Sequence, residues 1–556
     1  MSALKIAEGL HMTMTQRPTT APVIALPAPA RLPLLTVRVH ERALLRATAI
    51  AATVSRHRLS TFVWAARRGG ALAARSSAPA AVATVLHSYR TVPAYRDFLD
   101  GFGGLPPRPR GMSPEAWLEL LPTTSKHSYI DRYPVAQRCR GGILPTRGVE
   151  IDESAGSSGT PYQWARSGAE LSHVHTTLAL LSRYLLGSDK DIVTLNAFSM
   201  GAWSTGVNVS HAMKRIGAVK SCGPDADKCL DVLRLYGTDV RYAVCGYPPF
   251  LQQLVRRAAD RGLDLTAYDL VGFVGGEGMG EGLRREVEQT FARVWSAYGA
   301  SDLDIGVAAE TPVSVWLRQA ADADPSLARA LFGRVDRLPM VFQYDPSTYH
   351  ITTIEAEHGT ELVATVLRET LTPKLRYRVG DAGGTLTLAH ALTLAKAHGH
   401  VPDVDRARWG ADFALPLLFI HGRADSTVSF MGANLYPEDI AAGVEDAGAG
   451  LAPLLPGASA ARLGGFSLEL RGDLEPRPVI HIELEGCTGL EVERSVALTS
   501  YLVTTLRDRL ARNSDDYRVA LGEDPRAAEL FVELHEPGTG VFAVNAGRIK
   551  RRYLVA

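Results

Sequence analysis

The chain has 556 residues, and at about 150 residues per domain it has room for more than one hydrophobic core. Sixty lysines and arginines against 59 aspartates and glutamates leave a net charge of +1, which argues against nucleic acid or an anionic membrane as the partner. Hydrophobic residues make up 46% and charged residues 21%, so wholesale disorder is excluded. We expect a folded multidomain protein that binds small molecules or other proteins.

The cysteines and the apolar stretches point to a reducing compartment. Five cysteines are an odd number, sparse for this length, and no C-x-x-C pair is present. The N-terminus lacks the compact apolar block of a secretory signal. The longest stretch without an acidic or basic residue, 192–213, is broken by polar side chains, so it predicts buried interior rather than a membrane span. We predict a cytoplasmic protein without a membrane span.

The first 84 residues differ in composition from the rest. Five prolines between residues 18 and 33 favour extended, solvated backbone. Residues 37–83 are rich in alanine and arginine at helical spacing, which suits a solvated helical arm or a face that binds a partner. We predict an N-terminal extension over 1–84 that is partly helical or disordered.

From residue 191 onward, short apolar runs alternate with amphipathic stretches. The runs 192–196, 240–244 and 270–276 predict strands, and the segments 225–237 and 247–263 between them predict helices. This alternation is typical of an α/β domain with a largely parallel sheet.

After about residue 423 the pattern changes again. Residues 466–471, 479–485 and 530–536 alternate apolar and polar side chains, which predicts half-buried strands, and 491–511 has the spacing of an amphipathic helix. We predict a small α+β unit whose sheet is covered on one face.

The densest group of small and hydroxyl side chains is SAGSSGTP, residues 154–161. Glycine lets the backbone approach an anion closely, and successive amides and hydroxyls can surround phosphate oxygens. The motif is neither a Walker loop nor a Gly-x-Ser-x-Gly elbow, because it lacks Gly-Lys-Ser/Thr and the required glycine spacing. Taken alone, it fits a generic loop equally well.

Other motifs follow in a fixed order. They are HSYRTVPAYRDFLD and LPTTSK near the start, GGEGMGEGLRREVEQTF (275–291), VWSAYGASDLDIGVAAE (294–310), ELVATVLRETLTPKLRYRVGDAGG (361–384) and LLFIHGRADSTVSFMGANLYPEDI (417–440). Together with SAGSSGTP, this series resembles the adenylate-forming superfamily, and within it the phenylacetate-CoA ligase branch and its capsule-biosynthesis relatives. The resemblance runs from about residue 85 to the C-terminus. It implies a large α/β AMP-binding domain over 85–422 and a small mobile α+β lid domain over 423–556.

The resemblance implies ATP as a cofactor and assigns its contacts. The phosphates would be bound by a loop that consists of Ser154, Gly156, Ser157, Ser158, Gly159 and Thr160. The adenine would lie along Gly275, Gly276 and Glu277 and stack on Tyr298, beside Gly299 and Ser301. The ribose would contact Asp381 and Arg423. Thr160 stands where the family often has lysine, so this loop would rely on amides and hydroxyls. Asp302 stands where the family usually has glutamate, and there it would bind Mg²⁺.

The resemblance also assigns the mobile part of the site. Asp425 would lie at the hinge of the lid domain. Near the chain end, Arg548 or Lys550 would bridge the acyl carboxylate and the α-phosphate. Two residues apart on a strand, both would point to one face, so either could serve. An ordinary solvated basic tail remains an open alternative.

The acyl pocket is expected around Phe198, Trp203, Gly246 and Tyr247. An apolar stretch interrupted by glycine is equally typical of an ordinary core, so both interpretations stay open.

The implied reaction is the attack of a small carboxylic acid on the α-phosphate of Mg·ATP, which gives an acyl-adenylate and pyrophosphate. A thiol, most directly that of coenzyme A, then displaces AMP. One alternative sends the acyl group to a carrier-protein thiol or to an amine. Another, suggested by the departures at Thr160 and Asp302 and at the basic tail, is a nucleotide-binding protein whose catalysis has lapsed.

Overall fold

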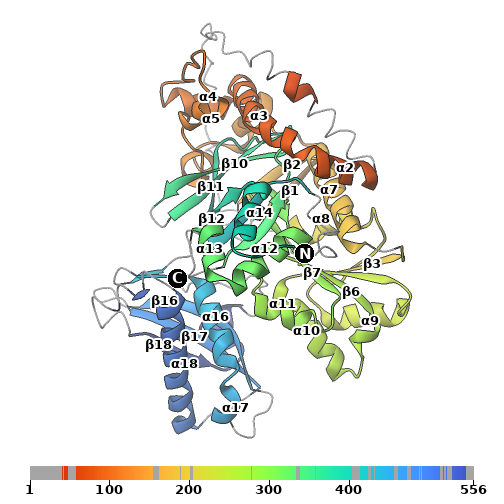
Figure 1. Cartoon of the computed structure of the whole chain (residues 1–556), viewed down its shortest axis with the longest axis vertical. Helices are drawn as coiled ribbons and strands as arrows, with labels where there is room; N and C mark the ends of the chain where they lie inside the picture. Colours follow the sequence, from red (N-terminus) through yellow and green to blue (C-terminus); the bar gives the residue numbers. More distant parts are fainter. Residues whose placement is uncertain are drawn as a thin grey trace, which may run out of the picture. The chain divides into compact units, whose positions relative to one another are not determined.

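A computed structural model gives the positions of most of the chain (Figure 1). The residues it describes are 41, 43–47, 58–153, 162–187, 189–200, 204–276, 278–333, 338–356, 359–402, 413–423, 428–430, 433–455, 461–471, 477–486, 489, 491–513, 517–518, 521 and 529–545.

An 11-stranded mixed sheet organises residues 192–423, with strand order β10-β11-β12-β13-β9-β8-β7-β6-β5-β3-β4 (Figure 1). Its strands are β3 Ile192–Asn196, β4 Ala218–Ser221, β5 Arg241–Gly246, β6 Asp269–Gly275, β7 Arg293–Ala300, β8 Asp304–Ala309, β9 Met340–Tyr344, β10 Tyr349–Ala356, β11 Gly359–Val366, β12 Tyr377–Leu386 and β13 Leu417–Arg423. The mixed α/β class predicted from the sequence is confirmed.

The sheet is parallel in one part and antiparallel in the other. Strands β4, β3, β5, β6 and β7 pair in parallel, as the apolar runs predict. From β7 through β8, β9, β13, β12 and β11 to β10, every pairing is antiparallel. The prediction of a largely parallel sheet therefore holds only for β4 to β7. Short connections such as those after β7 and β10 can join antiparallel neighbours only, because a parallel pair needs a long crossover.

Helices supply those crossovers in the parallel part. They are α8 Ser204–Met213, α9 Ala226–Tyr236, α10 Pro248–Asp260 and α11 Glu281–Val287. Local chemistry sets their starts: the Asp225 side chain accepts from Lys228 N to cap α9, and Pro248 opens α10, where a missing N–H costs nothing. Every residue of β3 is buried, as expected for a strand covered on both faces.

Further helices lie before and after the parallel strands. They are α4 Pro93–Asp100, α5 Pro114–Glu119, α6 Val135–Arg138, α7 Gly168–Leu186, α12 Pro312–Ala323, α13 Pro325–Phe332 and α14 Leu388–Ala397, with short turns at Lys126–Ile130, Arg140–Gly142 and Leu265–Ala267. A separate hairpin, β1 Val149–Glu153 with β2 Gln163–Ser167, flanks the serine- and glycine-rich segment.

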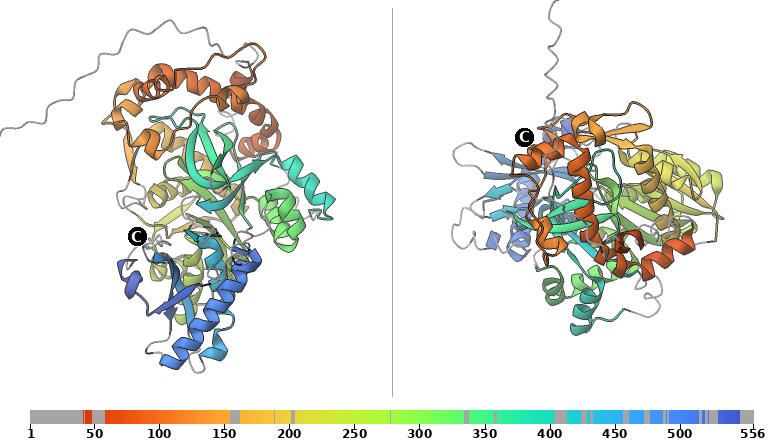
Figure 2. Two further views of the ribbon diagram at one scale, coloured as in Figure 1. Left: turned by 90° about the vertical axis from the view of Figure 1, so that its left-hand side faces the viewer. Right: turned by 90° about the horizontal axis from the view of Figure 1, so that it is seen from above.

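The N-terminal helices α2 Leu59–Arg68 and α3 Gly70–Thr91 agree with the helical spacing of residues 37–83 (Figure 1 and Figure 2). Helix α3 packs against α4, α5 and β10, and Ala81 and Val82 are fully buried. A Cβ at Gly70 would lie 2.0 Å from the carbonyl oxygen of Ala414, so only glycine allows this close approach. The boundary predicted at residue 85 falls inside this single buried helix.

Residues 428–545 contain a second, smaller set of elements. They are β14 Val428–Phe430, β15 Ala433–Leu435, α16 Pro437–Gly448, α17 Leu451–Leu454, β16 Arg462–Arg471, β17 Arg477–Glu485, α18 Val492–Asn513, β18 Phe531–His535 and a 3-10 turn at Gly540–Asn545. Strands β16, β17 and β18 form a three-stranded sheet in that order. Four leucines at every fourth position of α18 are fully buried and join the apolar side chains of this sheet in one core, namely Leu498, Leu502, Leu506 and Leu510. The alternation in the sequence correctly predicts this α+β arrangement.

Among the helices that the structure describes, none is long and apolar enough to cross a membrane.

Candidate functional site

The carboxyl ends of β3, β5, β6 and β7 meet at one edge of the parallel part, where open α/β sheets bind ligands. The rings of Phe198 and Tyr247 pack edge to face there, with centroids 5.3 Å apart at 80°. Gly276 has φ +83°, and a Cβ on it would lie 2.7 Å from Cε1 of Tyr247. Gly275 is equally confined, because its Cβ would lie 3.0 Å from the carbonyl oxygen of Ala297. The predicted adenine turn, Gly275 and Gly276, is therefore in contact with Tyr247 of the predicted acyl pocket.

Gly246 completes this edge, since a Cβ there would lie 3.2 Å from Cδ1 of Phe250. Phe198 itself is 5% exposed. These side chains therefore form a closely packed apolar wall beside the glycine turn. Their packing is equally typical of a substrate pocket and of an ordinary hydrophobic core.

Tyr298 and Asp381 are joined directly, although 83 residues separate them. The Tyr298 hydroxyl donates a short hydrogen bond to Oδ2 of Asp381, and the Tyr298 ring stacks on Phe342 with centroids 6.0 Å apart at 29°. Asp381 is 5% exposed and pairs with Arg423 in the β12–β13 register. Strands β7 and β12 are separated in the sheet by β8, β9 and β13, so the sheet must curl to bring these side chains together.

Asp302 lies in the turn between β7 and β8 and is 3% exposed. Its Oδ2 accepts from the Tyr377 hydroxyl at 2.9 Å, and Nζ of Lys126 lies 3.6 Å away. Nucleotide-bound Mg²⁺ is held by one or two carboxylates together with substrate phosphates, so Asp302 fits as the protein ligand. The Lys126 side chain keeps 29% of its surface exposed, which leaves its ammonium able to meet a phosphate.

The turn that carries Asp302 is fastened to the β1–β2 hairpin through Arg166. Its guanidinium donates to the carbonyl of Ser301 at 2.5 Å and to that of Leu303 at 2.7 Å. It also pairs with Asp152 on β1 at 2.6 Å. Just before this turn, at the end of β7, a Cβ at Gly299 would lie 2.5 Å from the Ile305 carbonyl oxygen. The two strands that flank residues 154–161 are therefore held against the candidate metal ligand.

Lys374 is a buried ammonium beside this site. Its Nζ lies 4.7 Å from the Trp164 ring centroid and 5.9 Å from that of Tyr377. Burial lowers the pKa of Lys374 to about 7, and the charge of Arg166 adds to the shift while Asp302 opposes it. Neither Lys126 nor Lys374 has a role predicted from the sequence, although LPTTSK and TPKLRYRVGD lie inside the motif series.

The pKa of Lys374 makes a prediction about stability. The unfolded chain holds the Lys374 proton up to about pH 10.5, whereas the folded chain releases it near pH 7, so the wild-type free energy of unfolding should rise with pH between these values. Lys374→Met removes this proton. At pH 6.5 we expect the variant to have a larger free energy of unfolding than wild type. At pH 9.5 we expect this difference between the two proteins to be about 3 kcal/mol smaller. Urea unfolding of both proteins at the two pH values measures the difference, and a pH-independent difference would contradict the shift.

The remaining predicted site residues lie outside the described residues. They are Ser154, Gly156, Ser157, Ser158, Gly159, Thr160, Trp203, Glu277, Asp425, Arg548 and Lys550. Arg423 is placed by its backbone as the last residue of β13.

Two kinds of solved structure share the fold. A 2-hydroxyisobutyryl-CoA ligase in the postadenylation state, in complex with 2-HIB-AMP, has a TM-score of 0.56 at 14% identity, with 87% of this chain and 88% of that chain covered. The acyl acid amido synthetase AtGH3.15 in complex with 2,4-DB has a TM-score of 0.54 at 13% identity, with 94% of this chain and 95% of that chain covered. No protein-family model and no curated protein sequence matches the chain. The chain has the fold of the adenylate-forming enzymes, as the ordered motifs predict.

Proposed function

We propose that the protein activates a small carboxylic acid with Mg·ATP, forming an acyl-adenylate and pyrophosphate, and then transfers the acyl group to the thiol of coenzyme A. The observation that carries the proposal is the Tyr298–Asp381 pair, which is linked through the β7–β8 turn to the buried carboxylate of Asp302. An aromatic face, a two-oxygen acceptor and a metal ligand are the groups that a base, a ribose and a magnesium phosphate require.

In this proposal the nucleoside is held at the ends of β6 and β7 and at Asp381 in the middle of β12. Asp381 accepts hydrogen bonds from the ribose hydroxyls, and the Tyr298 hydroxyl fixes the orientation of that carboxylate. The backbone of Gly275 and Gly276 lies along the base, since a side chain at either position would collide with its neighbours.

The loop at residues 154–161 has no lysine, so the positive charge that faces the phosphates is proposed to come from another segment. Lys126 lies beside Asp302 and over the Tyr162 ring, 5.5 Å from its centroid, next to strand β2. We propose that Lys126 meets the phosphates where Thr160 cannot. Bound Mg²⁺ would neutralise charge on the departing pyrophosphate. Arg548 or Lys550 stays the predicted bridge to the acyl carboxylate.

The acyl group is assigned to the wall formed by Phe198, Gly246 and Tyr247, with Trp203 as a further predicted member. Aromatic side chains around glycine suit an aromatic or short acyl group. The assignment to the phenylacetate-CoA ligase branch rests on the motif series alone.

An amine acceptor is the second candidate. The amido synthetase fold covers 94% of this chain, more than the 87% covered by the CoA ligase. A carrier-protein thiol is the remaining acceptor to test.

The first test is release of pyrophosphate that depends on ATP, Mg²⁺ and an added acid. Pools of aromatic, fatty and amino-acid carboxylates are supplied with hydroxylamine as a trap, and mass spectrometry identifies the hydroxamate. We expect one pool to release pyrophosphate and to give the matching hydroxamate. Adding coenzyme A, amines or a carrier protein to that acid then identifies the acceptor. ATP binding without release from any pool would contradict the proposal and favour a lapsed enzyme.

A further inference from the structure

Two imidazoles meet on one face of the three-stranded sheet. His481 of β17 lies opposite Glu533 of β18 in the parallel register, and His535 lies two residues farther along β18. Since side chains alternate along a strand, these residues occupy the face opposite to Ile480 and Ile482, which belong to the core shared with the α18 leucines. His481 is nevertheless 1% exposed.

The ligand atoms of this cluster are spaced for a tetrahedral metal ion. Nδ1 of His481 lies 2.9 Å from Nε2 of His535 and 3.4 Å from Oε2 of Glu533. The three ligand atoms all lie within 4.8 Å of one another. Zinc bonds of about 2.0–2.1 Å at the tetrahedral angle put ligand atoms about 3.3 Å apart. The two separations from Nδ1 of His481, 2.9 and 3.4 Å, lie on either side of that value.

The other side of the His481 ring has the partner that metal-binding histidines typically have. The other ring nitrogen of His481, Nε2, lies 2.9 Å from Oε2 of Glu469. Metal-binding histidines typically donate their second N–H to a carboxylate in this way, which fixes the tautomer that presents the free nitrogen to the metal. With its Nε2–H donated to Glu469, His481 has the lone pair of Nδ1 on the side where Nε2 of His535 and Oε2 of Glu533 lie.

His535 is held in place on its other sides. The Phe542 ring meets it edge to face with centroids 5.6 Å apart, and a Cβ at Gly540 would lie 2.3 Å from its Nδ1.

The surrounding charge favours a divalent cation. Three carboxylates, of Glu469, Glu483 and Glu533, face the imidazoles, whereas Arg471 supplies one positive charge by pairing with Glu533 at 2.6 Å and Glu469 at 2.7 Å. Together the three glutamates and Arg471 carry a formal charge of −2. Arg471 bonds mainly to Oε1 of Glu533, at 2.6 Å, and lies 3.2 Å from Oε2.

We propose that His481, His535 and Glu533 bind one divalent transition-metal ion, for which zinc is the best match, with Glu469 orienting His481. Imidazole and carboxylate ligands in a tetrahedral set favour zinc over magnesium or calcium. The ion fastens β18, an edge strand, to β17. This site is separate from the proposed nucleotide site and gives the small sheet a metal-dependent stability.

Calorimetric titration of the full chain, freed of metal with a chelator, tests the proposal with Zn²⁺ and with Co²⁺ as a spectroscopic probe. We expect one equivalent to bind, a visible Co²⁺ spectrum of tetrahedral type, and a rise in the melting temperature with Zn²⁺. His535→Ala and Glu533→Gln should abolish all three, while Glu469→Gln should weaken binding about tenfold.

The matched control is His127→Ala, which removes an exposed imidazole 3.3 Å from the Asp131 carboxylate. We expect it to leave the stoichiometry unchanged. Circular dichroism confirms that each variant is folded. Absence of binding in the wild type, or one equivalent still bound by folded His535→Ala, would overturn the proposal without bearing on pyrophosphate release.

Discussion

Asp381→Asn is expected to weaken ATP binding and to lower acid-dependent pyrophosphate release about 100-fold. The substitution preserves the size of the side chain but replaces a charged two-oxygen acceptor with one neutral oxygen and an NH₂ donor. A hydrogen bond to a charged group contributes about 1.5–3 kcal/mol, and two ribose hydroxyls lose that advantage here, so a loss of about 3 kcal/mol is reasonable. Each 1.4 kcal/mol is a factor of ten in affinity. Calorimetric ATP binding and the pyrophosphate assay measure the two effects.

Two further variants distinguish loss of the proposed ribose contact from a nonspecific effect of removing a carboxylate charge. Tyr298→Phe keeps the ring but removes the hydroxyl that orients Asp381, so we expect a smaller loss of about tenfold. The control is Asp264→Asn, which removes the charge of an exposed carboxylate. Among the contacts described, this carboxylate bonds to Thr266 in its own turn, so we expect ATP binding to be unchanged. Wild-type ATP affinity in Asp381→Asn would show that the ribose binds elsewhere.

The strands and most helices are predictable because their signals are local. The run at residues 192–196 is apolar because β3 is buried throughout. The alternation at residues 479–485 places Ile480 and Ile482 in the core with α18 and His481 on the other face, although His481 is buried as well. The antiparallel part of the large sheet is harder to predict, because the pairing of β13 with β9 joins segments more than 70 residues apart.

The site residues likewise include some that the sequence predicts and others that depend on contacts between distant segments. Tyr298, Asp302 and Asp381 could be named because they fall in motifs that resemble a known family. The structure brings the Tyr298 hydroxyl to Asp381 although β7 and β12 are not neighbouring strands, and Asp302 lies in the turn that follows β7. Lys126 and Lys374 could not be named. Lys126 lies 3.6 Å from Asp302 beside a bridge that joins Thr124 to Tyr377 across about 250 residues of sequence, and Lys374 lies over the ring of Trp164 in the distant strand β2. The pair His481 and His535 shows the same limit: alternation predicts the face of each strand, but not that β17 and β18 are neighbours.

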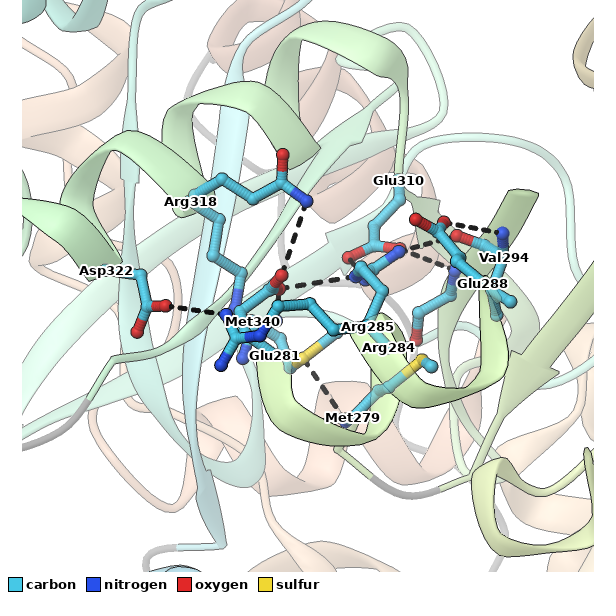
Figure 3. Close-up of polar contacts among 12 residues, drawn as sticks. Met279, Glu281, Arg284, Arg285, Glu288, Val294, Glu310, Arg318, Asp322 and Met340 are labelled. Atoms are coloured by element: carbon cyan, nitrogen blue, oxygen red, sulfur yellow. Dashed lines mark hydrogen bonds and ion pairs between the residues drawn. The ribbon is translucent and has the colours of Figure 1, made fainter. Parts of the chain in front are cut away.

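The other large effect is expected at α11, which follows the turn at Gly275 and Gly276 that is proposed to hold adenine. Arg284 is 1% exposed, and its guanidinium pairs with Glu310 at 2.6 Å and donates to the carbonyl of Val294 at 2.5 Å (Figure 3). The second oxygen of Glu310 accepts from Ser296 N at 2.7 Å. A second arginine, Arg318, pairs with Glu281 at the first turn of α11 (Figure 3). This cluster fixes the start of α11 against β7 and the end of β8.

Arg284→Met should lower the free energy of unfolding by about 3–5 kcal/mol, because it leaves the carboxylate of Glu310 buried without its cation. Arg285→Met on the same helix is the matched control: Arg285 is exposed, its contact with Asp322 is 3.4 Å long, and an exposed pair contributes less than about 1 kcal/mol. Urea unfolding measures both variants. Since α11 begins just after Gly275 and Gly276, the loosened helix start should also weaken ATP binding in Arg284→Met and not in Arg285→Met. Equal stability losses in the two variants would mean that the buried pair does not hold this turn.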